Sequence, residues 1–140
     1  LICDVIHIHP SAVRTTFKMF GDDKIILISD SMMATGMEDG TYQLGGQDVK
    51  VVGNLATLAG GGAIAGSATN LMDCLRTAVK TMGIPLNSAV KCATENPARS
   101  IGIYDSYGSI SEGKYANVVL LDKDLEIKAV IKKGEILNHK

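Results

Sequence analysis

The chain has 140 residues, enough for one domain with its own core, and its 46% hydrophobic and 21% charged residues are typical of a globular protein. Intrinsically disordered and fibrous classes are therefore excluded. A formal net charge of -1 leaves no basic surface for nucleic acid or for anionic membranes. We therefore expect no nucleic-acid partner and no membrane partner.

The cysteine pattern indicates a cellular compartment. Cys3, Cys74 and Cys92 are widely spaced and form neither a CxxC pair nor a dense disulfide framework, so we expect reduced, mostly buried thiols in a cytoplasmic protein. No segment reaches the roughly 20 apolar residues of a membrane span. Because the sequence begins at Leu1 and enters an apolar run at once, we also expect a piece of a longer protein.

One βαβ unit is predicted at the start of the chain. The apolar pattern predicts a strand over 1–8, a short helix over 12–20 and a second strand over 24–29. The unbroken apolar run of the second strand is typical of a strand buried on both faces. Strand, helix and strand within about thirty residues imply a parallel sheet.

Asp30 follows the second predicted strand directly. In (β/α) barrels the chemistry takes place at the carboxyl ends of the strands, so an acid at this position is a candidate catalytic residue. The alternative is an Asp that caps the following turn, a very common use of this residue. This segment alone leaves both interpretations open.

The rest of the chain predicts short strands and one clear helix. A small antiparallel insertion is expected at about 37–58, with strands over 41–44, 49–52 and 55–58. The clearest helix begins at Thr69 or Asn70 and ends at Gly83. Shorter helices are predicted over 87–93 and 97–101, and a final β-meander has strands over 118–121, 127–131 and 135–137.

Two histidines lie near the first predicted strand. On a strand, His7 and His9 would share one face, which is the spacing of paired metal ligands. A catalytic zinc site needs three protein ligands, however, and the chain offers no persuasive third one. The alternative is that one ring faces a polar cleft and the other contacts Pro10 and the following helix.

The glycine-rich segment 60–67 has the composition of a phosphate-binding loop. It lacks the Gly-Lys-Ser/Thr ending and follows no long buried strand, so it matches neither the nucleotide nor the dinucleotide fingerprint. Two interpretations remain: a loop that offers backbone groups to a polar ligand, or a plain linker. Ser67 is also a candidate cap for the helix that follows.

Several motifs together resemble the C-terminal part of the amidohydrolase superfamily. They are Asp30 at a strand end, the loop over 64–67, the Asn-Pro-Ala-Arg helix within 94–99, and the segment 108–122 that begins with Gly-Ser-Ile. Narrower features are similar to those members of the superfamily that deacetylate amino-sugar phosphates. These features are Asp-Val-Ile-His at 4–7, the segment 37–46 and the Ala-Gly-Ser turn at 65–67.

The resemblance implies an α/β fold class: the last two strands and helices of a (β/α)8 TIM barrel, plus strands of a small β-sandwich domain. It places the barrel part at 1–107, including the insertion at 37–58, and the sandwich strands at 108–140. A complete barrel needs roughly 250 residues. We therefore expect a C-terminal fragment.

The resemblance also implies a metal-dependent hydrolase that removes the acetyl group from N-acetylglucosamine 6-phosphate, giving glucosamine 6-phosphate and acetate. Asp30 would take a proton from the metal-bound water and give it to the departing amine. The positions that match substrate contacts are Asp4, Val5, Ile6, His7, Ile64, Ala65 and Gly66. Where this chain has Val5 the family usually has Gly, so we expect a close backbone approach there to be altered.

The divalent metal of the full-length enzyme, zinc or iron, is implied to be bound by a Glu and two His upstream of Leu1. We assign no metal ligand within this chain and expect it, alone, to bind no catalytic metal and to be inactive. The full-length protein is expected to be a homo-oligomer.

Two alternatives to this function stay open. The first is another amidohydrolase, such as a cyclic amidase or nucleobase deaminase; such enzymes would share Asp30 and the terminal motifs but not the insertion at 42–46. The second is a non-catalytic α/β module that binds another chain.

Overall fold

The computed structural model of the protein describes residues 1–137, so the last three residues of the predicted 108–140 segment lie outside it. The helices are α1 (Pro10–Phe20), the 3₁₀ turn η1 (Asp22–Lys24), α2 (Leu71–Lys80), α3 (Leu86–Ala93) and α4 (Glu95–Ser100). The strands are β1 (Gly40–Leu44), β2 (Gln47–Val52), β3 (Leu55–Leu58), β4 (Val118–Leu121), β5 (Ile127–Lys132) and β6 (Glu135–Leu137). Within this range no helix has the length and apolar composition needed to cross a membrane.

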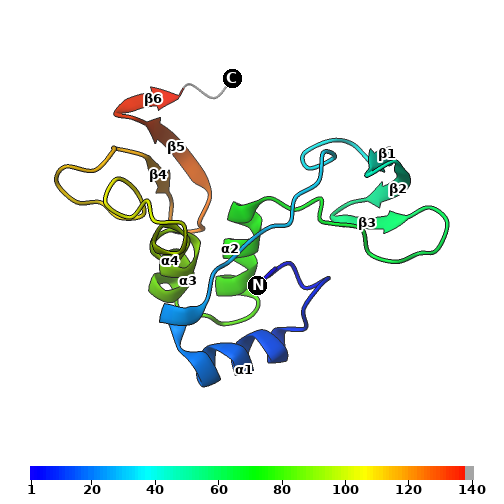
Figure 1. Ribbon diagram of the computed structural model, residues 1–140, viewed down its shortest axis with the longest axis horizontal. Coiled ribbons are helices and arrows are strands. Elements are labelled where there is room, and N and C mark those ends of the chain that lie inside the picture. The colour runs from blue at the N-terminus through cyan, green and yellow to red at the C-terminus, as the bar shows by residue number, and fades with distance from the viewer. Residues whose placement is uncertain (138–140) are drawn as a thin grey trace.

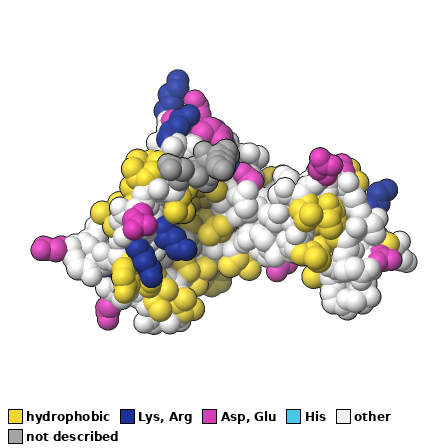
Figure 2. All heavy atoms as spheres, turned by 90° about the horizontal axis from the view of Figure 1, so that it is seen from above, with side chains coloured by type: hydrophobic (Ala, Val, Ile, Leu, Met, Phe, Trp, Pro, Cys, Tyr) yellow, Lys and Arg dark blue, Asp and Glu magenta, His cyan; other side chains and the backbone are white. Residues whose placement is uncertain are grey.

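The strands form two separate antiparallel sheets, in the orders β1-β2-β3 and β4-β5-β6. Figure 1 shows the first sheet projecting at one end of the molecule, while the second lies on the other side of the helices. Viewed from above in Figure 2, the molecule has two lobes joined by a narrower waist. The first sheet occupies the segment predicted as an insertion, whereas the division of the chain near residue 107 stays a prediction.

The strand predicted over 1–8 is wrong beyond its first residues. Ile2 pairs with Ile28 in a single parallel bridge, but the chain bends from Asp4 onward. The Asp4 carboxylate accepts hydrogen bonds from the backbone N–H groups of Ile6 and His7. These local hydrogen bonds replace a strand ladder, a competition that Asp side chains commonly win.

The second predicted strand is reduced to a bridge at Ile28, so within residues 1–137 the predicted parallel sheet is present only as isolated parallel bridges. Only one face of this extended segment is buried. Its first residue, Lys24, belongs to η1. Ile25 and Leu27 are 4% and 2% exposed, whereas Ile28 is 49% exposed. The prediction of burial on both faces is therefore wrong within residues 1–137, because no described element covers the side of Ile28.

The helices and the first sheet have separate cores. The larger core packs Val13 of α1 and Leu27 against the apolar faces of α2 and α3, and it includes all three cysteines. The smaller core packs Met32 against the inner face of the first sheet. Cys3, Cys74 and Cys92 are buried free thiols, and burial raises the pKa of each to about 11. The prediction of reduced, buried cysteines is confirmed.

Asn96 connects α4 to the extended segment that leads to Asp30. Its side chain is buried, and its amide nitrogen donates to the carbonyl oxygens of Asp22 and Ile25, each at 2.6 Å. A primary amide has two N–H donors and can satisfy both carbonyls at once. This contact gives a structural role to the Asn of the Asn-Pro-Ala-Arg motif.

Replacing Asn96 with Leu, which has a similar volume, should lower the free energy of unfolding by roughly 1 to 3 kcal/mol, because the buried Ile25 carbonyl oxygen and the partly buried Asp22 carbonyl oxygen lose a donor. Asn87→Leu is the matched control, since Asn87 is exposed on α3. Urea denaturation of both variants measures the difference. Equal midpoints for the two variants would contradict the anchoring role.

Gly108, the first residue of the Gly-Ser-Ile motif, packs tightly against α4. A Cβ atom at this position would lie 2.7 Å from the Ala98 Cβ and 3.0 Å from the Thr94 carbonyl oxygen, and its φ is +88°. Gly113 has a φ of +85°, but a Cβ there would meet nothing within 4 Å. The two glycines therefore share a backbone conformation and differ in available space.

This pair separates steric contact from backbone strain. Because only Gly108→Ala adds a clash, we expect it to destabilise the fold by about 1 to 3 kcal/mol more than Gly113→Ala. Thermal unfolding of the two variants under identical conditions gives the comparison. Indistinguishable melting temperatures would show that the close approach of Gly108 to α4 does not exist.

Candidate active site

Three extended segments lie side by side and bring the predicted site residues together. The segment that begins the chain is bridged in parallel to the next one through Ile2 and Ile28, and Ser31 is bridged in parallel to Ser67. Parallel pairing places Asp4 level with Asp30, because each lies two residues beyond its bridge. The predicted site segments 4–7, 30 and 64–66 therefore occupy neighbouring positions.

The backbone of Asp30 is held by the segment that follows the glycine-rich loop. The Ser67 N–H donates to the Asp30 carbonyl oxygen at 2.8 Å, and the Met32 N–H donates to the Ser67 carbonyl oxygen at 2.8 Å. Asp30 has a φ of +54°, in the left-handed region that residues other than glycine rarely adopt. The residue is exposed. The main chain at Asp30 is thus fixed while its side chain stays accessible.

The loop over 64–66 is an ordered turn, tied to β3 on one side and to Asp30 on the other. The Ala65 N–H donates to the Ala56 carbonyl oxygen at 3.0 Å. Gly66 has a φ of +66°, and a Cβ there would lie 3.5 Å from the Asp30 carbonyl oxygen. Ile64 is 46% exposed. These contacts show an ordered turn, and the binding of a polar ligand by this loop stays a prediction.

The predicted capping role of Ser67 is wrong. Asn70 caps α2, because its side-chain oxygen accepts from the Asp73 N–H at 2.9 Å. The Ser67 hydroxyl instead accepts from the Thr69 N–H at 2.9 Å and supports the turn before the helix. Ser67 therefore acts mainly through its backbone, beside Asp30.

Asp4 and His7 form a pair in which both oxygens of the buried carboxylate accept hydrogen bonds. The Asp4 side chain is 1% exposed, and its Oδ2 accepts from His7 Nδ1 at 2.7 Å. Its Oδ1 accepts from the N–H groups of Ile6 and His7, each at 3.0 Å. Burial raises the pKa of Asp4 and is the largest single influence, but the hydrogen bonds from His7 and Ile6 together outweigh it and hold this pKa below its usual range.

The predicted sharing of one strand face by His7 and His9 is wrong, because the chain bends between them. His9 caps α1, where its Nδ1 accepts from the Ser11 N–H at 3.3 Å. His7 instead faces Asp4. Within residues 1–137, no group of three or more His, Cys, Asp or Glu side chains is arranged to hold a metal ion.

Two hydroxyl groups that the sequence reasoning missed reinforce the contact between the segments. Ser31 Oγ donates to the Thr69 carbonyl oxygen at 2.7 Å, and Thr35 Oγ1 donates to the Ser67 carbonyl oxygen at 3.2 Å. For Ser31 the available signal was its position directly after Asp30, whereas Thr35 lies five residues after Asp30 and gave no such signal. Hydroxyl groups placed there can reach carbonyl groups of the neighbouring segment.

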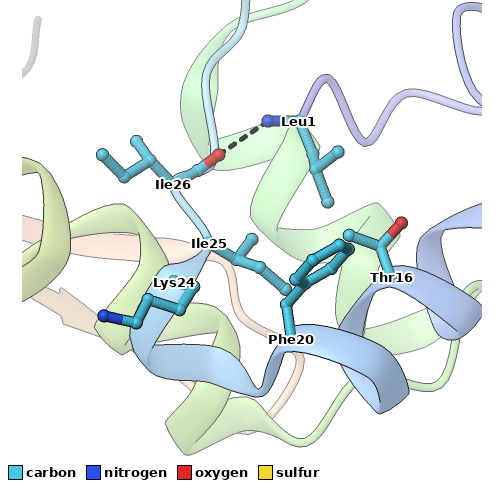
Figure 3. A pocket seen from close by; sticks show the side chains of 6 residues that line it. All are labelled: Leu1, Thr16, Phe20, Lys24, Ile25 and Ile26. Carbon is cyan, nitrogen blue, oxygen red and sulfur yellow. Dashed lines mark hydrogen bonds between the residues drawn. The ribbon is translucent and has the colours of Figure 1, made fainter.

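An apolar hollow of about 440 Å³ lies between α1 and the beginnings of the extended segments. Figure 3 shows Leu1, Phe20 and Ile25 around it, with the Leu1 nitrogen donating to the Ile26 carbonyl oxygen at 2.6 Å. Leu1 and Ile25 lie at the opposite ends of these segments from Asp4 and Asp30. The hollow is therefore separate from the candidate active site.

Comparison with known proteins defines the class. A model of the Amidohydrolase family matches residues 2–137. The chain therefore belongs to the amidohydrolase family. It is 38% identical over 136 residues to the N-acetylglucosamine-6-phosphate deacetylase of Bacillus subtilis (strain 168), an alignment that covers 97% of this chain and 34% of that protein. The chain thus spans about a third of the length of this curated relative.

Solved structures give the same picture. The N-acetylglucosamine-6-phosphate deacetylase of Pasteurella multocida matches with a TM-score of 0.94 at 27% identity, over 99% of this chain and 36% of that one. A variant of the Mycobacterium smegmatis enzyme, solved in complex with N-acetyl-D-glucosamine-6-phosphate, matches with a TM-score of 0.90 at 38% identity, over 97% of this chain and 36% of that one. The fold of this chain is that of one part of these larger enzymes.

Val5 carries a strained backbone in the candidate site. Its φ is +62°, and a β-branched side chain at such an angle is a genuine outlier. The residue is 49% exposed, so its side chain gains little from burial. A glycine at this position would adopt this angle without the steric penalty.

Val5→Gly should therefore raise the free energy of unfolding by about 1 kcal/mol, because the relief of left-handed strain exceeds the added chain entropy of glycine. The matched control is Val119→Gly: Val119 is 48% exposed but lies in β4, where glycine should destabilise by about 1 kcal/mol. Urea denaturation compares the two. Equal destabilisation by both substitutions would contradict strain at Val5.

Proposed function

We propose that this chain forms the C-terminal third of a metal-dependent amidohydrolase that removes the acetyl group from N-acetylglucosamine 6-phosphate, with Asp30 as general base and general acid. The observation that carries the proposal is the position of Asp30. It is an exposed acid that ends an extended, parallel-paired segment, and its backbone is bonded to Ser67 beside the 64–66 loop. The names of the relatives support the substrate class.

We further infer that the segments 1–3 and 25–31 belong to the last two strands of a (β/α)8 barrel, with β4–β6 in a small β-sandwich domain. The parallel bridge between Ile2 and Ile28, with α1 between them in the chain, supports this. In such barrels the active site lies at the carboxyl ends of the strands. Asp4 and Asp30 lie at those ends.

The reaction requires a group that moves one proton. Water attacks the acetamide carbonyl carbon, the C–N bond breaks, and the nitrogen leaves with one more proton. Asp30 can accept the proton of the attacking water and return it to the departing nitrogen. A divalent metal, zinc or iron, would lower the pKa of that water, and we place its ligands in the part of the protein that precedes this segment. The 4–7 turn and the 64–66 loop would contact the sugar phosphate.

A chimera tests the role of Asp30. This chain replaces the matching third of the Bacillus subtilis relative, to which it is 38% identical. We expect the chimera to release acetate from N-acetylglucosamine 6-phosphate, and Asp30→Asn to lower kcat by roughly 10² to 10⁴-fold, the usual contribution of a positioned general base. Asp105→Asn, which changes another exposed carboxylate, is the matched control and should leave kcat near that of the parent chimera.

Each outcome decides one part of the proposal. The isolated chain, supplied with zinc or iron, should bind no stoichiometric metal and release no acetate; stoichiometric metal with turnover would show that it is not a dependent fragment. A folded, metal-loaded chimera without activity would contradict the assigned chemistry. Hydrolysis of cyclic ureides or deamination of adenine instead would support another amidohydrolase activity.

A further inference from the structure

Burial closes the Asp4 carboxylate off from a ligand. Its side chain is 1% exposed, and both oxygens accept hydrogen bonds from within the 4–7 turn. A residue bound in this way affects a ligand only through the groups that it holds. Those groups are the backbone of the turn and the ring of His7.

The bond to Asp4 determines where the His7 ring carries its proton. An ionised carboxylate only accepts hydrogen bonds, so Nδ1 of His7 must be the donor in their 2.7 Å contact. In the neutral ring, Nε2 is then left as an acceptor. His9 shows the opposite arrangement, because its Nδ1 accepts from the Ser11 N–H and its own proton must lie on Nε2.

The same carboxylate supports a strained backbone. Val5 has a φ of +62°. It lies between Asp4 and the two residues, Ile6 and His7, whose N–H groups donate to the Asp4 carboxylate. Strained residues persist where the surroundings fix them, and they gather at functional sites. The 4–7 turn is therefore built to hold one geometry, and Asp4 is the side chain that holds it.

We propose that Asp4 is a positioning residue for His7: its buried carboxylate fixes the neutral imidazole in the Nδ1–H tautomer and leaves Nε2 as the ring atom offered to the amino-sugar phosphate. This inference rests on the proposed function. It replaces direct substrate contact by the Asp4 side chain with an action through His7.

The tautomer can be measured in the chain itself, which has three histidines. His139 lies outside the described residues, and His139→Gln removes its signals. In nitrogen-15 NMR spectra of the neutral rings, we expect His7 to carry its proton on Nδ1 and His9 on Nε2. A neutral His7 with its proton on Nε2 would overturn the proposal whether or not any variant folds.

Asp4→Asn tests the consequence. Asn can still accept from the N–H groups of Ile6 and His7, but its NH₂ group would face Nδ1 and force the proton onto Nε2. In the active chimera we expect kcat/KM to fall about ten- to a hundredfold, the size of effect known for the loss of a hydrogen-bond partner that orients a metal-binding histidine. Asp39→Asn is the matched control, because Asp39 also accepts a backbone N–H, that of Gly53, but lies outside the 4–7 turn.

A double-substitution cycle separates positioning from stability. If Asp4 acts through His7, Asp4→Asn should have little further effect on kcat/KM in a His7→Gln chimera. Fully additive effects, or an Asp4→Asn chimera with parental kinetics, would overturn the proposal. An unsubstituted chimera without activity would contradict the proposed function instead, and the tautomer measurement would still decide the pairing of Asp4 with His7.

Discussion

The backbone hydrogen bonds between Ser67 and the Asp30 segment are the constraint on which the candidate site depends. They join two parts of the chain that the first sheet separates in sequence, at 2.8 Å on each side of Ser67. A backbone hydrogen bond contributes only about 1 kcal/mol net. The hydroxyl groups of Ser31 and Thr35 add further bonds to the same segment. Together these contacts make one surface from Asp30 and the 64–66 loop.

Two of the four non-glycine residues with positive φ in residues 1–137 lie at this surface, and the other two, Leu125 and Lys133, lie elsewhere. Val5 and Asp30 both have positive φ, and they follow neighbouring parallel segments. Each such residue costs of order 1 to 3 kcal/mol and persists only where its surroundings determine its conformation. The Asp4 carboxylate fixes the first and the Ser67 backbone fixes the second. A side-chain carboxylate and a backbone group thus have the same effect: each fixes the main chain of a residue whose side chain stays accessible.

The elements that could be predicted from the sequence are those whose signals are local. The alternation and glycine turns of β1–β3 lie within a few residues of one another, and α2 has an apolar stripe and the Asn70 cap. The first strand could not be predicted correctly, because a single side chain, Asp4, outweighs the strand preference of its apolar neighbours. The predicted burial of Ile28 was wrong for another reason. Burial depends on which element covers a face, and the periodicity of the sequence does not reveal that element.

The candidate site likewise has features with a local sequence signal and features that depend on the tertiary fold. Asp30 could be placed at the end of an extended segment from the apolar run before it, and the Gly-rich loop could be recognised by composition. Its contact with Asp30 depends on Ser67, a residue whose backbone does the bonding, so its side-chain type gave no signal. The role of Asn96 was hidden likewise, because its partners Asp22 and Ile25 are brought to it only by the tertiary fold.

Asp30 facing the attacking water is the central claim. The most direct measurement is a crystal structure of the metal-loaded chimera, in which the separation between the Asp30 carboxylate and the metal-bound water can be read. We expect a hydrogen-bond distance of about 2.6 to 3.2 Å. An Asp30 side chain turned away from the metal, with a different residue at that distance from the water, would contradict the claim.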